Sequence, residues 1–321
     1  MLGRDERHIS TAHLPDLGDR LDTEVALGRR SAPDQPPHTG GRWWHDPANP
    51  LLRALLFVLV LAVAALGTVP FETDGRAPDH VYLLAQLVGS IVGYLVVVLL
   101  LEGRRPPVEL APHRAGGLLI GLALGAGCCL LVFLVCLAGG WRTISGTNPD
   151  APMLMPLLQL GVVASVSEEI IFRGLLFRLV EAGLGTWGAV LVSALVFGAV
   201  HLSNPQASWW GAVAIALEAG VMFALLYALT RSLWLVIGVH AAWNVLQGPV
   251  LGSAVSGATA NGDGLLITQP AGPELLSGGV FGLEASLVSV VVWLAASGWL
   301  VRRLLVRRLV VAPSWRRHWV L

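Results

Sequence analysis

The chain has 321 residues, of which 55% are hydrophobic and 13% are charged, and its mean hydropathy is +0.68. This composition excludes an ordinary soluble domain. The formal net charge is zero, but the charges are unevenly placed, and six arginines lie among the last 20 residues. We therefore expect the lipid bilayer to be the main partner of the chain and expect no nucleic acid.

Residues 1–50 are polar, contain several prolines and glycines, and lack the short apolar core of a cleavable signal peptide. They predict a disordered N-terminal tail. The apolar part of the chain predicts a membrane domain at 51–301, and the arginine-rich end predicts a basic cytoplasmic tail at 302–321. That tail could lie along anionic lipid or act only as a stop-transfer signal.

Eight apolar runs are each long enough to cross a bilayer, which takes about 20 helical residues. They predict an all-α, polytopic membrane protein with eight transmembrane helices. The expected spans are Leu51–Phe71, His80–Leu101, Gly116–Gly140, Met153–Leu179, Thr186–Leu202, Ser208–Leu229, Leu233–Leu251 and Gly279–Val301.

The loop charges predict the orientation of these spans, because positively charged loops stay in the cytoplasm. With eight spans, one set of loops holds Arg104, Arg105, Arg114, Arg178 and Arg231, whereas the opposite loops are mainly acidic. The sequence therefore predicts a multi-pass protein of the cell membrane with both termini in the cytoplasm.

Three further patterns concern packing. Gly117, Gly121 and Gly125 recur every four residues, which predicts that another helix approaches closely. The stretch Gly252–Gly278 is rich in Gly, Ser and Pro and predicts an extracytoplasmic loop that could cap a site. Several tryptophans are expected at span ends or facing lipid, namely Trp209, Trp210, Trp234, Trp293 and Trp299.

Ionisable residues inside the spans are unusual, because a charge in the membrane core costs at least about 2.5 to 3.5 kcal/mol. This chain has a group of them, together with one asparagine: Glu168, Glu169, Arg173, His201, Glu218, His240, Asn244 and Glu284. Glu284 lies near the outer end of its expected span, where an interfacial position is the usual interpretation. For Glu218, polar packing within the bundle is favoured over catalysis.

The spacing of these residues predicts which of them pair with each other and which face a cavity. Glu169 and Arg173 are four residues apart, on one helical face, and are expected to form an ion pair. Glu168 points about 100° away from Glu169 around the helix and is left to face a cavity.

Hairpin geometry predicts which residues meet. The midpoint between positions 168 and 201 falls on the Leu184–Gly185 turn, so Glu168 and His201 are expected at matching depth. The same counting leaves His240 several residues deeper than His201, so a tilted or shifted helix is needed to bring it to the site.

Three motifs follow one another on successive spans: EExxxR at Glu168–Arg173, FxxxH at Phe197–His201 and HxxxN at His240–Asn244. Together they resemble the CPBP family of intramembrane proteases, also called the ABI or CAAX-protease family, which includes the Ras-converting endopeptidase of prenylated proteins. The resemblance covers residues 152–248. It implies a membrane fold that encloses a catalytic cavity near the cytoplasmic leaflet, and hydrolysis of a peptide bond in a membrane-anchored or hydrophobic protein or peptide.

The expected catalytic residues are Glu168, Glu169, His201, His240 and Asn244, with structural support from Arg173 and Phe197 and a candidate secondary polar site at Glu218. Glu168 and His201 can hold and deprotonate a water molecule. The resemblance implies that His240 and Asn244 stabilise the oxyanion that forms during hydrolysis. Glu168, His201 and His240 are also a possible ligand set for one zinc ion, so that a metalloprotease and a metal-independent glutamate-type protease both stay open.

Other functions compete with this prediction. Buried Glu, His and Arg also make the proton relays of transporters, although no internal repeat typical of a transporter is evident. A membrane protein that binds a partner without cleaving it, or a purely structural hydrogen-bond network, would use the same residue types.

Overall fold

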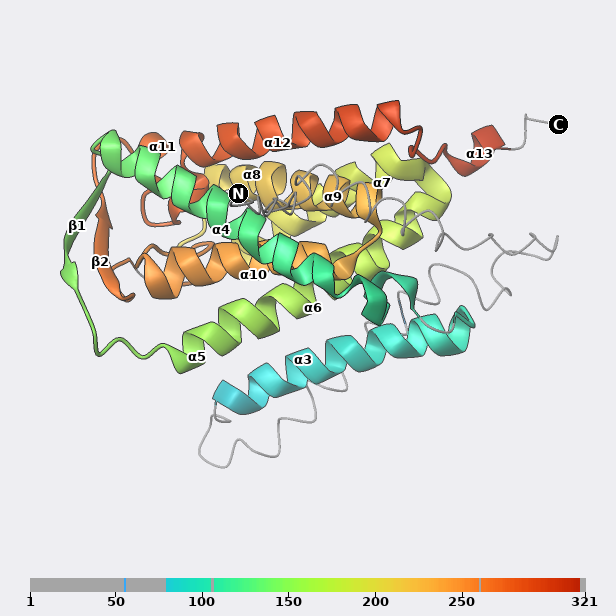
Figure 1. The fold of residues 1–321 in the computed structure, drawn as a ribbon, viewed down its shortest axis with the longest axis horizontal. Helices are drawn as coiled ribbons and strands as arrows, with labels where there is room; N and C mark the ends of the chain where they lie inside the picture. Colours follow the sequence, from blue (N-terminus) through green and yellow to red (C-terminus); the bar gives the residue numbers. More distant parts are fainter. Residues whose placement is uncertain (1–54, 56–78, 105–106, 260, 318–321) are drawn as a thin grey trace, which may run out of the picture.

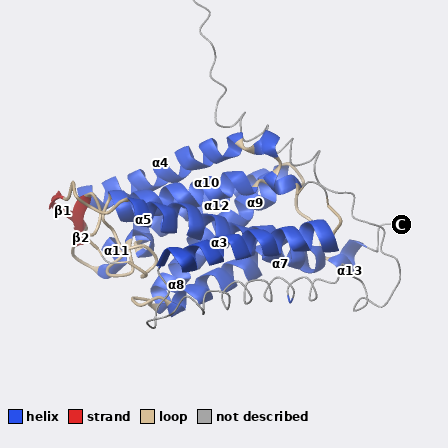
Figure 2. Ribbon diagram, turned by 90° about the horizontal axis from the view of Figure 1, so that it is seen from below, coloured by secondary structure: helices blue, strands red, loops and turns tan. Residues whose placement is uncertain are grey.

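The computed structural model describes Leu55 and residues 79–104, 107–259 and 261–317. Most of these residues are helical, and the long helices lie side by side in a layered bundle (Figure 1). A short pair of strands lies at one end of the bundle and α13 lies at the other (Figure 2). The expectation of a helical membrane protein is confirmed, with one small sheet added.

The helices follow the chain order of the apolar runs. The α-helices are α3 (Asp79–Leu95), α4 (Gly116–Ala138), α5 (Leu154–Pro156), α6 (Ser165–Glu169), α7 (Arg178–Val200), α8 (Trp209–Ile215), α9 (Phe223–Thr230), α10 (Leu233–Val245), α11 (Glu274–Ser277), α12 (Leu287–Val306) and α13 (Ser314–Arg317). Wider π-type turns extend or connect several of them, at Val96–Leu101, Leu157–Ala164, Ile170–Phe177, Ala216–Met222 and Leu246–Val250. Short 3-10 turns lie at Val108–Leu110, Pro112–Arg114, His201–Ser203 and Leu283–Ala285.

Six helical segments within the described residues are long and apolar enough to cross a membrane. The expected span Leu51–Phe71 and the tail 1–50 lie outside the described residues, apart from Leu55. One of the six, Leu154–Ser203, has 50 residues and joins the expected fourth and fifth spans. Since about 20 residues suffice for one crossing, this segment is long enough for two.

The 50-residue segment turns back at Gly185, where φ is 73° and ψ is 179°. This positive φ favours glycine. An added Cβ would also lie 2.6 Å from the carbonyl oxygen of Val311. The two arms then run side by side, since the rings of Phe172 and Phe197 lie 4.8 Å apart. The turn therefore lies where the sequence places it.

Helix α4 packs against α10 through its glycines. A Cβ on Gly121 would lie 2.9 Å from the backbone nitrogen of Val239, and one on Gly125 would lie 3.0 Å from the Cα of Val239. The predicted close approach is confirmed, and the partner is the helix that carries His240 and Asn244. Beside this contact, Leu233 and Leu235 of α10 are fully buried in the main hydrophobic core.

One end of the bundle carries irregular chain and a two-stranded antiparallel sheet. Strand β1 (Arg142–Thr147) pairs with β2 (Leu266–Pro270), with Arg142 opposite Pro270 and a register shift between Ile144 and Gly146. The expected all-α fold therefore lacks this one small sheet. The sheet ties the segment after α4 to the loop that precedes α12.

The last long helix differs from its expected bounds. We expected Gly279–Val301, but α12 begins at Leu287, where the Ser286 hydroxyl accepts from the backbone N–H of Ser289. Three glycines with positive φ, Gly278, Gly279 and Gly282, prevent an earlier start. The helix also continues to Val306, beyond the expected boundary at 301.

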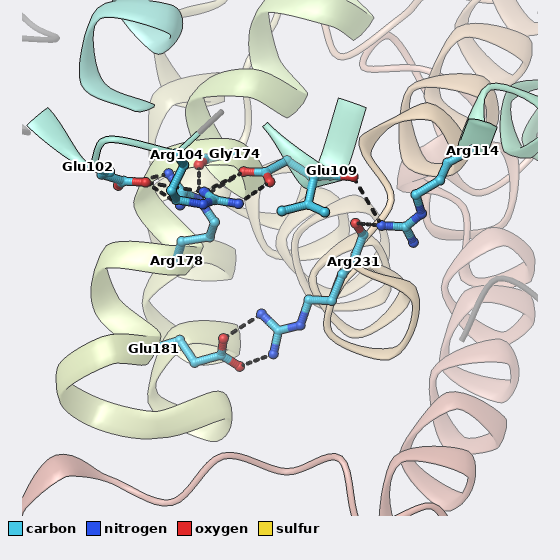
Figure 3. A network of polar contacts seen from close by, with 9 residues as sticks. Glu102, Arg104, Glu109, Arg114, Gly174, Arg178, Glu181 and Arg231 are labelled. Carbon is cyan, nitrogen blue, oxygen red and sulfur yellow. Dashed lines mark hydrogen bonds and ion pairs between the residues drawn. The ribbon is translucent and has the colours of Figure 1, made fainter. Parts of the chain in front are cut away.

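The opposite end of the bundle holds a network of arginines and glutamates (Figure 3). Glu102 accepts from Arg178 at 2.9 and 3.1 Å, and Glu109 accepts from Arg104 at 2.5 Å. Arg231 pairs with Glu181 at 2.5 Å. Of the arginines that we expected in loops on one side of the membrane, Arg104, Arg114, Arg178 and Arg231 lie together, and their assignment to the cytoplasm stays a prediction.

Candidate functional site

The motif spans enclose a cavity of about 380 Å³. It is lined by six of the eight residues that the sequence assigned to the site: Glu168, Phe197, His201, Glu218, His240 and Asn244. Glu169 and Arg173 lie behind this wall and are fully buried. The structure thus brings the three motifs together and separates the two adjacent glutamates as their helical angle predicts.

Glu169 connects two of the motifs. Its Oε1 accepts a hydrogen bond from Arg173 Nη1 at 3.0 Å and lies 2.8 Å from His240 Nδ1. Because both Glu169 and Arg173 have no exposed surface, this ion pair is shielded from water. A carboxylate paired with an arginine acts as an acceptor, so Nδ1 of His240 carries the proton that is shared with Glu169.

Arg173 is held from several sides. Its Nη2 donates to the carbonyl oxygen of Ala219 at 2.7 Å. Its guanidinium carbon lies 4.8 Å from the ring centre of Phe197 and 5.3 Å from that of Phe223. Aromatic faces attract a guanidinium at such distances. Phe197, which we expected as a supporting residue, therefore packs on the buried cation.

His201 is oriented by its own helix end. Its Nδ1 lies 2.7 Å from the carbonyl oxygen of Phe197, one turn earlier. A carbonyl oxygen only accepts hydrogen bonds, so Nδ1 carries hydrogen and the neutral ring has its lone pair on Nε2. The α-helix ends at Val200, and His201 opens the 3-10 turn that follows, at the edge of the cavity.

His240 reaches the site despite the offset in residue counting. Its Nε2 lies 4.0 Å from Oε2 of Glu168, whose side chain is 24% exposed. The ring of Phe197 is 4.8 Å from that of His201 and 6.4 Å from that of His240, so both imidazoles flank the same phenyl group. The offset that residue counting left between His201 and His240 is therefore closed in the structure.

Asn244 follows His240 by one helical turn and also lines the cavity. Both side chains are buried, with 7% and 6% of their surface exposed. The side-chain amide of Asn244 offers an N–H donor to a group bound between the two residues, and Nε2 of His240 offers a second donor only when the ring carries both hydrogens.

Two features of the cavity differ from the sequence interpretation. Glu284, expected at an interface, is only 3% exposed and lines the cavity. Trp293, expected to face lipid or lie at a span end, is 4% exposed, and its ring centre lies 5.1 Å from that of Trp243. Glu284 belongs to the 3-10 turn Leu283–Ala285, whose residues are all buried, and Trp293 lies on the buried face of α12.

The loop before α12 covers one side of the cavity. Val255, Ser256 and Ala258 contribute to the lining. The Asn204 side chain donates to the Ser256 carbonyl at 2.6 Å, which links the loop to the turn that carries His201. The predicted extracytoplasmic loop therefore does lie over the site, although its side of the membrane stays a prediction.

Glu168, His201 and His240, which are candidate ligands for a zinc ion, line the same cavity but do not form a ready ligand cluster in this arrangement. No three His, Cys, Asp or Glu side chains within the described residues lie close enough together to hold a metal ion. His240 directs Nδ1 to Glu169, and His201 directs Nδ1 to a backbone carbonyl.

In the charged network at the other end of the bundle, the glutamates are paired with arginines. Burial alone would raise the pKa of Glu109, but the charges of Arg178 and Arg104 outweigh it and hold the pKa at about 2. Glu109 is therefore ionised and paired throughout the physiological range. Such a group supports structure rather than proton transfer.

Two comparisons with known proteins bear on this cavity. Residues 150–246 match the protein-family model described as "Type II CAAX prenyl endopeptidase Rce1-like". Over an alignment of 213 residues the chain is 28% identical to "Putative membrane peptidase YdiL" of Bacillus subtilis (strain 168). The alignment covers 59% of this chain and 84% of that protein. The resemblance to CAAX-type proteases that the three motifs predict is confirmed, and both comparisons support a multi-pass membrane peptidase.

Proposed function

We propose that this protein is an intramembrane endopeptidase of the CAAX-protease type that hydrolyses a peptide bond in a membrane-associated protein or peptide. One observation carries the proposal: the Glu168 carboxylate faces the cavity beside His240, which Glu169 and Arg173 orient from behind. The arrangement supplies a base at the wall and a fixed donor next to it.

Glu168 is the general base. Its Oε2 is buried without a hydrogen-bond partner among the described residues, while the side chain as a whole is 24% exposed, so the carboxylate keeps unused acceptor capacity for a water molecule. Glu168 takes a proton from that water, and the hydroxide oxygen attacks the carbonyl carbon of the scissile bond. His201 holds the water through Nε2, because its Nδ1 is engaged with the Phe197 carbonyl.

His240 and Asn244 stabilise the negative oxygen that forms on the attacked carbonyl. The Glu169 carboxylate accepts from Nδ1 of His240, so Nε2 is the ring atom left for the cavity, where it donates to the oxyanion when the ring carries both hydrogens. Arg173 donates to Glu169 from behind and holds its carboxylate in place. The bond to the leaving nitrogen then breaks as Glu168 returns the proton to it, so Glu168 ends in its starting state.

We propose that these steps need no tightly bound metal ion. Glu168, His201 and His240 remain the residues to examine if one is present. Elemental analysis of the purified protein tests this point, and a stoichiometric zinc content that is lost together with activity on chelation would contradict it.

The test of the activity uses the protein in liposomes and a farnesylated peptide that ends in a CAAX sequence, because the matching family model is named for prenyl endopeptidases. The same peptide without the lipid tests whether a membrane anchor is required. Wild type should cleave, and Glu168→Gln and His201→Ala should not. Retained cleavage in either variant would exclude this mechanism.

A second arm identifies the substrate when the farnesylated peptide is not cleaved. Membrane peptides from cells that express wild type or Glu168→Gln are compared by mass spectrometry. Peptides whose new ends depend on Glu168 identify the substrate class, and identical peptide sets in the two strains would exclude a peptidase.

A further inference from the structure

The cavity contains two carboxyl groups that the proposed hydrolysis does not use. Glu218 comes from the π-type turns between α8 and α9, and Glu284 comes from the 3-10 turn before α12. Both line the cavity, with 2% and 3% of their surface exposed. They are close enough to each other for electrostatic interaction.

Glu218 is only partly satisfied. Its Oε1 is buried and has no hydrogen-bond partner among the described residues. Leaving such an oxygen unpaired in a buried site costs about 1 to 3 kcal/mol, and more if the group is charged. A group that lies in the middle of a transmembrane segment at this cost is commonly functional.

Glu284 is fixed in place. Its Oε1 accepts from the backbone N–H of Ser256, and its Oε2 accepts from the side-chain amide of Gln247. Burial raises its pKa to about 7, even though the hydrogen bonds from Ser256 lower it. The Ser256 contact also connects this carboxyl to the loop over the cavity.

The charges around the cavity are one-sided. Three glutamates line it, Glu168, Glu218 and Glu284, while no arginine does so within the described part of the chain. Arg173 binds Glu169, and Arg142 binds Asn261 and Ser253 and acts on Glu284 only through its charge, without a hydrogen bond to it. Two neighbouring buried carboxyls ionise together only at high cost, which a cation placed between them offsets.

The apolar walls suit the stem of such a cation. Phe223, Trp243 and Trp293 all line the same cavity. Aromatic faces attract ammonium and guanidinium groups and also pack against their alkyl stems. A basic side chain could thus bury its stem against the rings while its charged end reaches the carboxyls.

We propose that Glu218 and Glu284 form a subsite for a basic side chain, lysine or arginine, of the peptide that is cleaved at Glu168. This inference rests on the proposed peptidase function for the identity of the ligand, but the subsite itself is testable without cleavage. It names the substrate class as a membrane-associated peptide with a basic residue near the scissile bond.

The first experiment measures binding of two small probes to the protein in nanodiscs of neutral lipid. The probes are 4-phenylbutylamine, which is cationic, and 4-phenylbutanol, which has the same stem and no charge. Fluorescence of the cavity tryptophans reports binding. We expect the amine to bind at least about tenfold more tightly than the alcohol in wild type.

Variants locate the site of this preference. Glu218→Gln and Glu284→Gln should each bring the two affinities to within about threefold of each other. Glu274→Gln, an exposed carboxyl in the same loop region, should keep the wild-type ratio. A wild-type ratio near one, or a ratio unchanged in both cavity variants, would overturn the subsite; the wild-type measurement decides even if a variant fails to fold.

The second experiment connects the subsite to the substrate. A lysine is moved through each position around the cleaved bond of the peptide and compared with norleucine, its uncharged counterpart. One position should favour lysine at least about tenfold in kcat/KM, and Glu218→Gln should reduce that ratio. Equal cleavage of all lysine and norleucine pairs would overturn the proposed substrate class while leaving the peptidase function intact. Absence of cleavage together with amine-selective binding would overturn the peptidase function while leaving the cation subsite intact.

Discussion

The two ends of the helical bundle hold charged residues in opposite states. At one end, Glu102, Glu109 and Glu181 are paired with arginines in a network that connects the segment before α4 to α7 and α9. At the cavity, Glu168 and Glu218 each keep a buried oxygen without a hydrogen-bond partner among the described residues. Paired charges stabilise a fold, whereas carboxylates without partners are available to react with or bind another molecule. The same residue types therefore serve structure at one end and, we propose, chemistry at the other.

The largest effect that separates the two ends is expected for Glu168→Gln. Loss of the general base should lower cleavage about 100- to 10,000-fold. Thermal stability should change little, because Glu168 Oε2 contributes no hydrogen bond to the fold. Peptide cleavage and the Tm are measured on the same preparation, and a large fall in Tm would show that Glu168 is structural.

Arg173→Met tests the buried ion pair beside the cavity, which we expect to support both the stability of the fold and the catalytic geometry. It leaves the buried Glu169 without its ion-pair partner, and breaking a buried pair costs about 3 to 5 kcal/mol of unfolding free energy. Cleavage should be lost as well, because Glu169 no longer orients His240. The double variant Glu169→Leu/Arg173→Met should recover much of the stability but no activity; recovered activity would contradict the role of Glu169.

Gly121→Ala tests how α4 supports the site. Its Cβ would lie 2.9 Å from a backbone atom of α10, and forcing such contacts apart costs about 1 to 3 kcal/mol. Gly127→Ala is the matched control on the same helix, because nothing lies within 4 Å of its added Cβ. We expect a lower Tm and weaker cleavage only in the Gly121 variant, and equal behaviour of the two would argue against the close approach.

The smallest effect concerns the paired end. The folded-state pKa of Glu109 is about 2, below its usual value of 4.5, so its ion pairs contribute stability above pH 4.5 that is lost as the pH falls towards 2. Glu109→Gln should lower the Tm at neutral pH and flatten its decline across this window. A Tm profile identical to that of wild type would show that the network adds no net stability.

Local patterns predict much of this structure. The apolar runs place α3, α4 and α10 closely, the midpoint of the hairpin falls at Gly185, and a four-residue spacing predicts the pair Glu169–Arg173. These features depend on contacts within a helix or between adjacent helices.

Other features depend on contacts between distant segments. The pairing of β1 with β2 joins residues more than a hundred positions apart, and neither strand is long or regular enough to be evident from alternation. The cavity position of Glu284 depends on the irregular chain before α12, where three glycines have positive φ, and that of Trp293 depends on which face of α12 packs against the bundle. The approach of His240 to Glu168 depends on the relative depth and tilt of helices from separate spans, and periodicity carries no information about either.

Helix α4 has a consequence for protein engineering. It precedes the 150–246 segment that matches the family model, yet its glycines fix α10, and the chain continues from it into β1, which pairs with the loop over the cavity. A chimera that exchanges only the motif-bearing segment between two relatives would separate that segment from the helix and the strand that hold it in place. Transfer of substrate preference should therefore require α4, both strands and the motif spans to be moved as one unit.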